Sequence, residues 1–183
     1  MVRLKISKVY LGIGSNLGQR GENIQNAMLN LERWGVKILR ASGIYETEPV
    51  GMKNAGWFYN MVVCAETVFL PEELLKAISA IEMAMGRAKK FMKGDGRFFL
   101  SRVEEWGSRA YDSRLIDIDI LFYGDLTVEM AGLTIPHPRI AERRFVLVPL
   151  AEIAPELTHP ILKKTVAELL KGCKDKAIVR PLA

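Results

Sequence analysis

The sequence predicts one domain that mixes helices and strands. The chain has 183 residues, which is enough to bury a substantial core in a single domain. Of these residues 49% are apolar, and they fall into short runs with strand or helix periodicity. No run approaches the roughly 20 apolar residues that a membrane-spanning helix needs, so we expect no membrane partner.

The start of the chain and its cysteines favour a cytoplasmic protein. Residues 1–6 are too short and too charged for a secretory signal, and a strand follows them directly. Cys64 and Cys173 have no metal-ligand neighbour at useful spacing, so we expect them to be reduced thiols.

A strand and a helix open the predicted domain. Residues 9–13 have the character of a strand, and the glycine-rich stretch 12–18 predicts a tight turn after it. Its spacing, G-x-G-x-x-x-G, differs from the G-x-G-x-x-G of a dinucleotide-binding turn. The next helix ends at Gly35. Its apolar stripe consists of Ile24, Ala27, Met28, Leu31 and Trp34.

Two further strands are predicted at 36–45 and 60–68, with a long loop at 46–56 between them. Loops of this length inside a domain often carry function. The strand at 60–68 is almost wholly apolar, so we expect it to be central and covered on both faces. At the start of this strand, the carboxamide of Asn60 has a donor and an acceptor. It can hydrogen-bond either to the edge of a heterocycle or to nearby backbone groups.

A second helix and a basic segment follow. Pro71, with acidic residues directly after it, begins the helix. Glu82 borders the apolar stripe, which consists of Leu74, Leu75, Ile78, Ile81 and Met85. Between Arg87 and Arg114 the chain has eight basic and four acidic residues. Such a segment indicates either a polyanionic partner, which means nucleic acid or nucleotide phosphates, or a solvated loop.

The strand predicted at 114–123 carries the most informative pattern. Its period-2 alternation places Ile116, Ile118, Ile120 and Phe122 on one face and Asp117 and Asp119 on the other, with Leu115 and Leu121. The two aspartate Cα atoms are then about 6.6 Å apart, and their side chains point the same way. Paired carboxylates of this kind suit Mg²⁺, which takes one or two carboxylates and completes its shell with water and phosphates. The alternative is a half-exposed strand with two solvated aspartates.

In the last part of the chain the sequence predicts a rigid loop, a strand and a helix. His137 lies between two prolines, so its loop position is fixed, and nearby arginines make it a candidate phosphate donor. Residues 145–150 are apolar and strand-like, and residues 165–170 form a short helix.

Together these motifs resemble the 6-hydroxymethyl-7,8-dihydropterin pyrophosphokinase family. The resemblance covers roughly residues 8–160, with the motifs in family order. No single motif is specific, but the set is. Its parts are GIGSNLG at 12–18, ETEP at 46–49, FYN at 58–60, Glu82 with Gly86-Arg87, SRLIDID at 113–119, and IPHPR at 135–139 through RRFVLVPL at 143–150.

The resemblance implies a ferredoxin-like α+β fold with a mainly antiparallel sheet and helices packed on one face. It also implies an enzyme of folate synthesis that transfers pyrophosphate from ATP to the pterin hydroxymethyl group and releases AMP. Two Mg²⁺ ions are implied at Asp117 and Asp119, and Asp119 or a metal-bound hydroxyl is the candidate general base. We expect ATP and the pterin as partners, no nucleic acid, and a monomer or weak homodimer.

The family pattern assigns roles residue by residue. The implied catalytic residues are Arg87, Arg114, Asp117 and Asp119. The residues expected to bind ATP are Glu82, Arg87, Lys89, Arg114, Ile120, Thr134, His137 and Arg143. The residues expected to bind the pterin are Thr47, Val50, Phe58, Asn60 and Phe145.

We expect residues 1–183 to form a single pyrophosphokinase domain. Its largest departure from the family is an unusually long catalytic loop at about 88–112, which we expect to bring basic residues to ATP. Two other classes remain open from the residues alone. One is a ferredoxin-like RNA-binding module, and the other is a two-metal phosphatase or nuclease that uses Asp117 and Asp119.

Overall fold

A computed structural model describes residues 5–50, 56–86 and 115–182 of the chain. These residues form an α+β domain with a six-stranded sheet of order β5-β1-β4-β3-β8, in which β2 also pairs with β4. The sheet strands are β1 (Ser7–Ser15), β2 (Lys37–Ala41), β3 (Tyr45–Thr47), β4 (Phe58–Thr67), β5 (Asp117–Tyr123) and β8 (Val179–Pro181). The remaining elements are α1 (Arg20–Arg33), α2 (Pro71–Ala84), β6 (Val128–Met130), β7 (Leu133–Ile135), η3 (Ile140–Glu142), α3 (Arg144–Ile153) and α4 (Val166–Gly172).

The order of elements confirms the predicted ferredoxin-like arrangement. The chain runs β1-α1-β2-β4-α2-β5, and every pairing within the main sheet is antiparallel. β1 and β4 are the central pair, in register from Ser7 opposite Thr67 to Ser15 opposite Tyr59. Five consecutive buried residues in β4, from Met61 to Ala65, show that this strand is covered on both faces, as its apolar sequence predicted.

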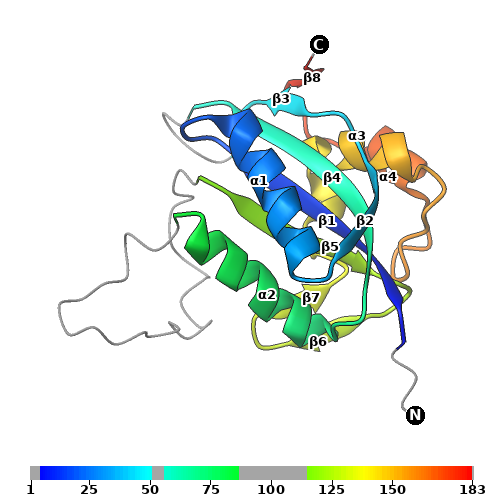
Figure 1. Ribbon diagram of the computed structural model, residues 1–183. Coiled ribbons are helices and arrows are strands. Elements are labelled where there is room, and N and C mark those ends of the chain that lie inside the picture. The colour runs from blue at the N-terminus through cyan, green and yellow to red at the C-terminus, as the bar shows by residue number, and fades with distance from the viewer. Residues whose placement is uncertain (1–4, 51–55, 87–114, 183) are drawn as a thin grey trace.

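Helices α1 and α2 lie side by side across one face of the sheet (Figure 1). Their buried residues meet alternate residues of the strands, such as Val9, Leu11 and Ile13 of β1. The predicted apolar stripe of α1 is correct for Ile24, Ala27 and Leu31, which are buried. The prediction that Trp34 belongs to this apolar stripe is wrong. Trp34 is the C-cap residue and is 47% exposed, because the chain turns away there at Gly35, whose φ is +86°.

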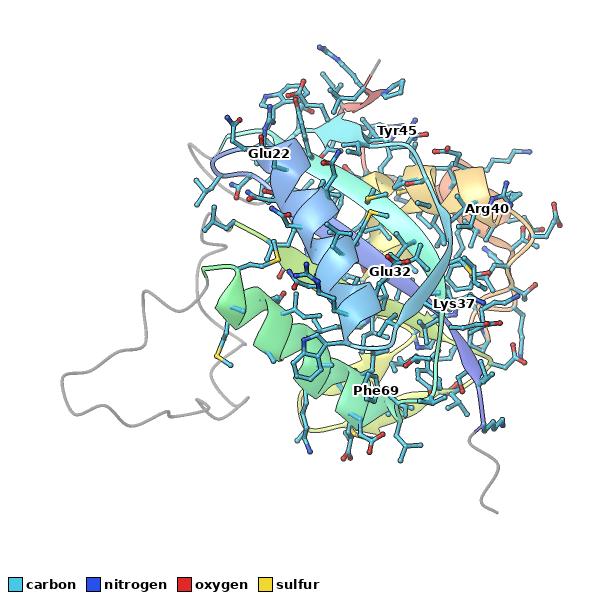
Figure 2. The ribbon with its side chains drawn as sticks, in the orientation of Figure 1. Glu22, Glu32, Lys37, Arg40, Tyr45 and Phe69 are labelled. Atoms are coloured by element: carbon cyan, nitrogen blue, oxygen red, sulfur yellow. The ribbon has the colours of Figure 1, made fainter. Side chains whose placement is uncertain are left out.

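Helices α3 and α4 lie against the opposite face (Figure 1). The strand predicted at 145–150 is therefore wrong, because these residues belong to α3. Six consecutive apolar residues carry no period that separates strand from helix, and Pro149, which a helix interior disfavours, hid the helix. The helix is held to the sheet edge by Arg40, whose guanidinium donates to the Ile153 carbonyl at 3.0 Å. Figure 2 labels this side chain on β2.

The strand predicted at 36–45 is divided into β2 and β3. Both pair with β4, but residues 42–44 between them leave the ladder. Ser42 takes over one bond, since its hydroxyl accepts from the Val62 N–H at 3.0 Å. The break lets β3 continue along β4 toward the end of the sheet where β8 joins it.

A bulge in β5 corrects a second detail of the predicted pattern. Leu11 pairs with Ile120 and Tyr10 pairs with Phe122, so Leu121 is an extra residue in the ladder. After the bulge the side chains of β5 alternate between the faces in the opposite order. Phe122 therefore packs with α3 and α4 instead of with α1 and α2. The aspartates lie before the bulge, so their predicted facing is unaffected.

Among the described residues, none of the helices combines the length and the apolar character needed to cross a membrane.

Candidate active site

The two aspartates lie opposite two glycines on the sheet. In the β1–β5 ladder Asp117 is paired with Gly14, and Asp119 is paired with Gly12. Both pairs are on the face away from α1 and α2, since Ile13 between the two glycines and Leu11 before them point into the helix-covered core. Because glycine has no side chain, the surface beside the carboxylates stays open, and a substrate can approach the sheet backbone.

One of these glycines is required by a close contact. Gly14 is also paired with Asn60 on β4, and a Cβ atom at Gly14 would lie 2.6 Å from the Asn60 Oδ1 atom. Asn60 is buried, and its amide donates a 2.7 Å hydrogen bond to the Thr47 hydroxyl on β3. The bond fixes which amide atom faces β3. It therefore orients the carboxamide oxygen toward Gly14.

A pocket of about 790 Å³, part of it open to solvent, extends over this surface. Its floor is formed by β1, β4 and β5, and α3 closes one side. The residues that line it are Gly12, Ile13, Gly14, Thr47, Glu48, Val50, Phe58, Asn60, Met61, Val62, Asp117, Asp119, Arg139, Arg143, Phe145 and Val146. It thus combines two aromatic rings, an oriented amide, two carboxylates and two guanidinium groups.

All five residues that we expected to bind the pterin line this pocket. Phe58 begins β4 and Phe145 lies in the first turn of α3, so the two rings enter from different elements. Asn60 and Thr47 lie on the sheet between them, and Val50 lies in the loop after β3. A flat heterocycle is bound well by such a set, because rings pack against its faces while an amide reads its edge.

Arg143 joins the carboxylate side of the pocket to the α3 side. Its Nη1 atom is 3.6 Å from the Asp119 Oδ2 atom and 3.5 Å from the His137 Nε2 atom. The guanidinium carbon also lies 5.6 Å from the centre of the Phe145 ring. Arg143 is 8% exposed, so its charge acts in a partly desolvated site where electrostatic interactions are strengthened.

His137 is neutral at ordinary pH. Burial, followed by the neighbouring charges of Arg143 and Arg139, lowers its pKa from 6.5 to about 4. Its Nδ1 atom accepts a hydrogen bond from the Arg139 backbone N–H at 3.2 Å. The neutral ring therefore has its proton on Nε2, the atom near Arg143. This tautomer presents a donor on the same side as the guanidinium, as an anion-binding group requires.

The remaining described residues that we expected to bind ATP lie near the edge of β5 that does not pair with β1. The buried Glu82 of α2 accepts from the Ile118 N–H at 2.9 Å, so alternate backbone groups of β5 point to this edge. Ile120 is next in that alternation. Its side chain is buried in the core, which leaves only its backbone for a ligand. Thr134 is exposed on β7, and β7 contacts β5.

Three predicted residues, Arg87, Lys89 and Arg114, lie outside the described residues, as does the long loop predicted at 88–112. The described site residues form two groups. Those expected to bind the pterin line the pocket together with the aspartates and Arg143, whereas Glu82, Ile120, Thr134 and His137 lie along or beside β5 without lining it.

Sequence reasoning assigned no site role to eight residues that line the pocket: Gly12, Ile13, Gly14, Glu48, Met61, Val62, Arg139 and Val146. The glycines were interpreted as part of a turn, but β1 extends to Ser15 and includes both of them. A usable signal was present. G-x-G and D-x-D have the same period of two, which predicts two facing rows when their strands are neighbours.

The donor set fits a divalent metal ion that is bound together with a phosphate ligand. No group of three or more His, Cys, Asp or Glu side chains able to hold a metal occurs within residues 5–50, 56–86 and 115–182. Asp117 and Asp119 supply two hard oxygen donors on one face, which matches Mg²⁺ with a shell completed by water and phosphate. It does not match a site that the protein alone completes.

Known proteins identify the family. The sequence model of the family described as HPPK, 7,8-dihydro-6-hydroxymethylpterin-pyrophosphokinase, matches residues 10–155. This chain belongs to that family. The match includes every described residue of the site, from Gly12 to Val146, and ends at the close of α3.

Curated relatives are similar over most of this chain. A protein of Aquifex aeolicus named 2-amino-4-hydroxy-6-hydroxymethyldihydropteridine pyrophosphokinase is 38% identical over 163 residues, which are 89% of this chain and 90% of the relative. The folic acid synthesis protein fol1 of Pneumocystis carinii is 36% identical over 170 residues. In that case the match covers 93% of this chain but only 20% of the longer fungal protein.

Solved structures support the fold. The crystal structure of Plasmodium falciparum HPPK-DHPS A437G with SDX-DHP matches 93% of this HPPK-family chain with a TM-score of 0.69. Its sequence identity is 19%, and the match covers 46% of that chain. At this identity the similarity establishes the ferredoxin-like α+β fold and no more.

Proposed function

We propose that this chain transfers pyrophosphate from ATP to the hydroxymethyl group of 6-hydroxymethyl-7,8-dihydropterin, giving AMP and the pterin diphosphate in folate synthesis. The observation that carries the proposal is the pocket in which two aromatic rings and an oriented amide adjoin two carboxylates and an arginine. Family membership over residues 10–155 supports the same reaction.

The pterin binds between Phe58 and Phe145. Their rings pack against the two faces of the bicycle, and the Asn60 carboxamide hydrogen-bonds to its edge. The bond from Asn60 to Thr47 holds that amide in one orientation before the substrate arrives. A preorganised amide favours the pterin over flat molecules that lack a matching donor and acceptor.

ATP binds along β5. The backbone of Ile120 and the carboxylate of Glu82 are at the edge for the base, and His137 and Arg143 face the phosphates. A neutral His137 donates from Nε2 without adding charge, and Arg143 supplies the charge. Arg87, Lys89 and Arg114 are proposed to complete the phosphate contacts. The residues at 88–112 are proposed as a long catalytic loop of a single domain, 1–183.

Asp117 and Asp119 are proposed to hold two Mg²⁺ ions together with the triphosphate. When bound, these ions neutralise charge on the phosphates and on the attacking oxygen. Among the described residues, Arg143 has its Nη1 atom 3.6 Å from the Asp119 carboxylate. We propose that this guanidinium turns from the carboxylate to the phosphates when ATP binds.

Positioning supplies most of the rate in such a transfer. The pterin oxygen attacks the β-phosphorus, the bond from that phosphorus to the AMP oxygen breaks, and the hydroxyl proton is released. The protein holds the two substrates in line, because one pocket contains both the pterin walls and the carboxylates.

The two other classes are not favoured. A phosphatase or nuclease would need further acidic or histidine ligands, and the described residues contain no cluster of three such groups. An RNA-binding sheet displays aromatic side chains on an open face, whereas here α3 and α4 cover part of that face and the neighbouring positions of β1 and β5 carry Gly12, Gly14, Asp117 and Asp119.

The test is product analysis. Purified chain is incubated with ATP, Mg²⁺ and 6-hydroxymethyl-7,8-dihydropterin, and nucleotides are separated by chromatography. We expect AMP and pterin diphosphate in equal amounts and no AMP when the pterin is omitted. Release of ADP or inorganic phosphate in place of AMP would contradict the proposal.

A further inference from the structure

The end of the chain returns to the candidate active site. After α4 the segment from Asp175 to Leu182, which includes β8, runs along the open side of β3 (Figure 1). We call it the C-terminal strap. It lies beyond residue 155, where the family match ends, so family membership assigns it no role. It nevertheless contacts three elements that supply walls of the pterin pocket.

The first contact is with the beginning of α3. The Asp175 carboxylate accepts from the Arg144 backbone N–H at 3.0 Å and from the Ala177 N–H at 2.9 Å. Arg144 is the first residue of α3, and the preceding residue, Arg143, makes no side-chain cap hydrogen bond. Asp175 therefore does from a distance what an N-cap residue does locally. Both neighbours of Arg144, Arg143 and Phe145, line the pocket.

The second contact is with the end of β3. Glu48 N–H donates to the Ile178 carbonyl at 3.1 Å, and Ile178 N–H donates to the Glu48 carboxylate at 2.7 Å. The next pair in the ladder is Thr47 opposite Val179. Thr47 and Glu48 both line the pocket, and Thr47 accepts the bond that orients Asn60.

The third contact is with the residue before β4. The guanidinium carbon of Arg180 lies 5.3 Å from the centre of a Trp57 ring, within the range of a cation–π interaction. Phe58, the next residue, is one of the two pocket rings. The strap thus reaches the segments that carry both rings, one through Asp175 and the other through Arg180.

We propose that the C-terminal strap is a positioning element for the pterin, and that Asp175 is the residue through which it acts on α3. The strap sets the separation of the Phe58 and Phe145 rings, because it is hydrogen-bonded to the start of α3 and its Arg180 lies against Trp57, next to Phe58. Asp175 touches neither ring, so it is a positioning residue. This inference rests on the proposed function, since the ligand between the rings is the pterin.

The experiment compares Asp175→Ala with Thr165→Ala in the full chain. Thr165 is a matched control: its hydroxyl caps α4 by accepting from Glu168 N–H at 3.2 Å, and α4 contributes no residue to the pocket. Loss of either cap is expected to destabilise the fold to a similar extent. Only Asp175→Ala should raise the KM for the pterin, by about five- to tenfold, while kcat and the KM for ATP change less than about twofold.

Two further results decide the inference. Asp175→Asn keeps an oxygen that can accept from Arg144 N–H, so it should restore most of the pterin KM. An Asp175→Ala enzyme whose pterin KM equals that of Thr165→Ala would overturn the proposal. So would an unchanged amide exchange rate in the first turn of α3. A wild-type chain that makes no AMP would instead contradict the proposed function, and the two failures are therefore distinguishable.

Discussion

The two faces of the sheet use the same strands for different purposes. On the face toward α1 and α2, β1 contributes Val9, Leu11 and Ile13, each at most 1% exposed. On the other face the same strand contributes Gly12 and Gly14, which pack no side chain of their own. Because successive residues of a strand alternate between faces, one sequence can encode a close-packed core and an open site at once.

The comparison indicates a division between stability and chemistry. Close packing on the first face stabilises the fold, since each fully buried aliphatic side chain contributes about 1.5 to 3 kcal/mol. On the second face α3 and α4 pack over part of the sheet and α3 borders the pocket, where carboxylates and glycine backbone remain accessible. A substitution on the first face should therefore change stability, and one at the site should change activity.

The largest expected effect is at the aspartates. Asp119→Ala removes a carboxylate that faces the pocket, so turnover should fall by at least about 10²-fold. The thermal unfolding midpoint should change far less than turnover, because the side chain is not part of either core cluster and its ion pair with Arg143 is long, at 3.6 Å. AMP formation and calorimetry provide the two measurements.

Asp125→Ala is the matched control for this substitution. Asp125 is exposed in the turn after β5, and we expect wild-type turnover from its variant. An Asp119→Ala enzyme that retained full activity would break the assignment of chemistry to the second face.

The core face should show the opposite behaviour. Leu11→Ala empties a site that is 0% exposed between the sheet and α1, and we expect a loss of about 2 to 5 kcal/mol in the free energy of unfolding. Leu29→Ala on the outer side of α1, where Leu29 is 52% exposed, should cost far less. Denaturant titration measures both, and equal losses would contradict the distinction between the faces.

The two pocket glycines should differ from each other. In Gly14→Ala the new Cβ atom meets the Asn60 oxygen at 2.6 Å, whereas in Gly12→Ala it meets Leu121 at an ordinary 3.5 Å. We expect Gly14→Ala to displace the amide, to cost about 1 to 3 kcal/mol and to raise the pterin KM. Gly12→Ala should leave the free energy of unfolding nearly unchanged. Equal stability of the two variants would show that Asn60 moves at no cost.

The smallest expected effect is a pH dependence of stability. His137 has a pKa of about 4 in the folded chain and an ordinary pKa of 6.5 when unfolded, so the unfolded chain binds more protons between these values. Stability therefore falls as the pH drops below 6.5, by about 1 to 2 kcal/mol down to pH 5. Burial lowers the pKa of His159 as well, and its effect has the same sign.

His137→Gln tests this contribution, because glutamine does not titrate. Denaturation of the variant without ligands should show a shallower loss between pH 6.5 and 5 than the wild type. A loss as steep as that of the wild type would mean that His137 is not desolvated in the folded chain.

Residue patterns predicted the parts of the site that lie on regular strands. The period of two placed Asp117 and Asp119 on one face, and the apolar run of β4 indicated a central strand. The residues expected for the pterin were inferred from family motifs, and the structure brings all five to one pocket. The facing of the aspartates and the central place of β4 could be predicted because they depend on local alternation and composition, and the five residues are brought together because family motifs keep their order.

The remainder depends on tertiary pairing. A bulge places Phe122 on the opposite face of the sheet from the one predicted. The bulge arises from the pairing of β5 with β1, and a local sequence pattern contains no information about that pairing. Residues 145–150 form a helix that Asp175 caps from thirty-one positions along the chain. The contacts that residues 175–182 make with β3 and with the start of α3 are not predicted by local patterns for the same reason, since they join segments far apart in the sequence.

The position of β8 has a practical consequence. The last strand, β8, lies beside β3, whose Thr47 lines the pocket, whereas β1 begins at the opposite end of the sheet (Figure 1). An affinity tag or fluorescent reporter attached after β8 would therefore be attached at the end of the sheet that carries the pocket. Attachment ahead of β1 keeps such additions away from it and is the choice for kinetic and ligand-soaking work.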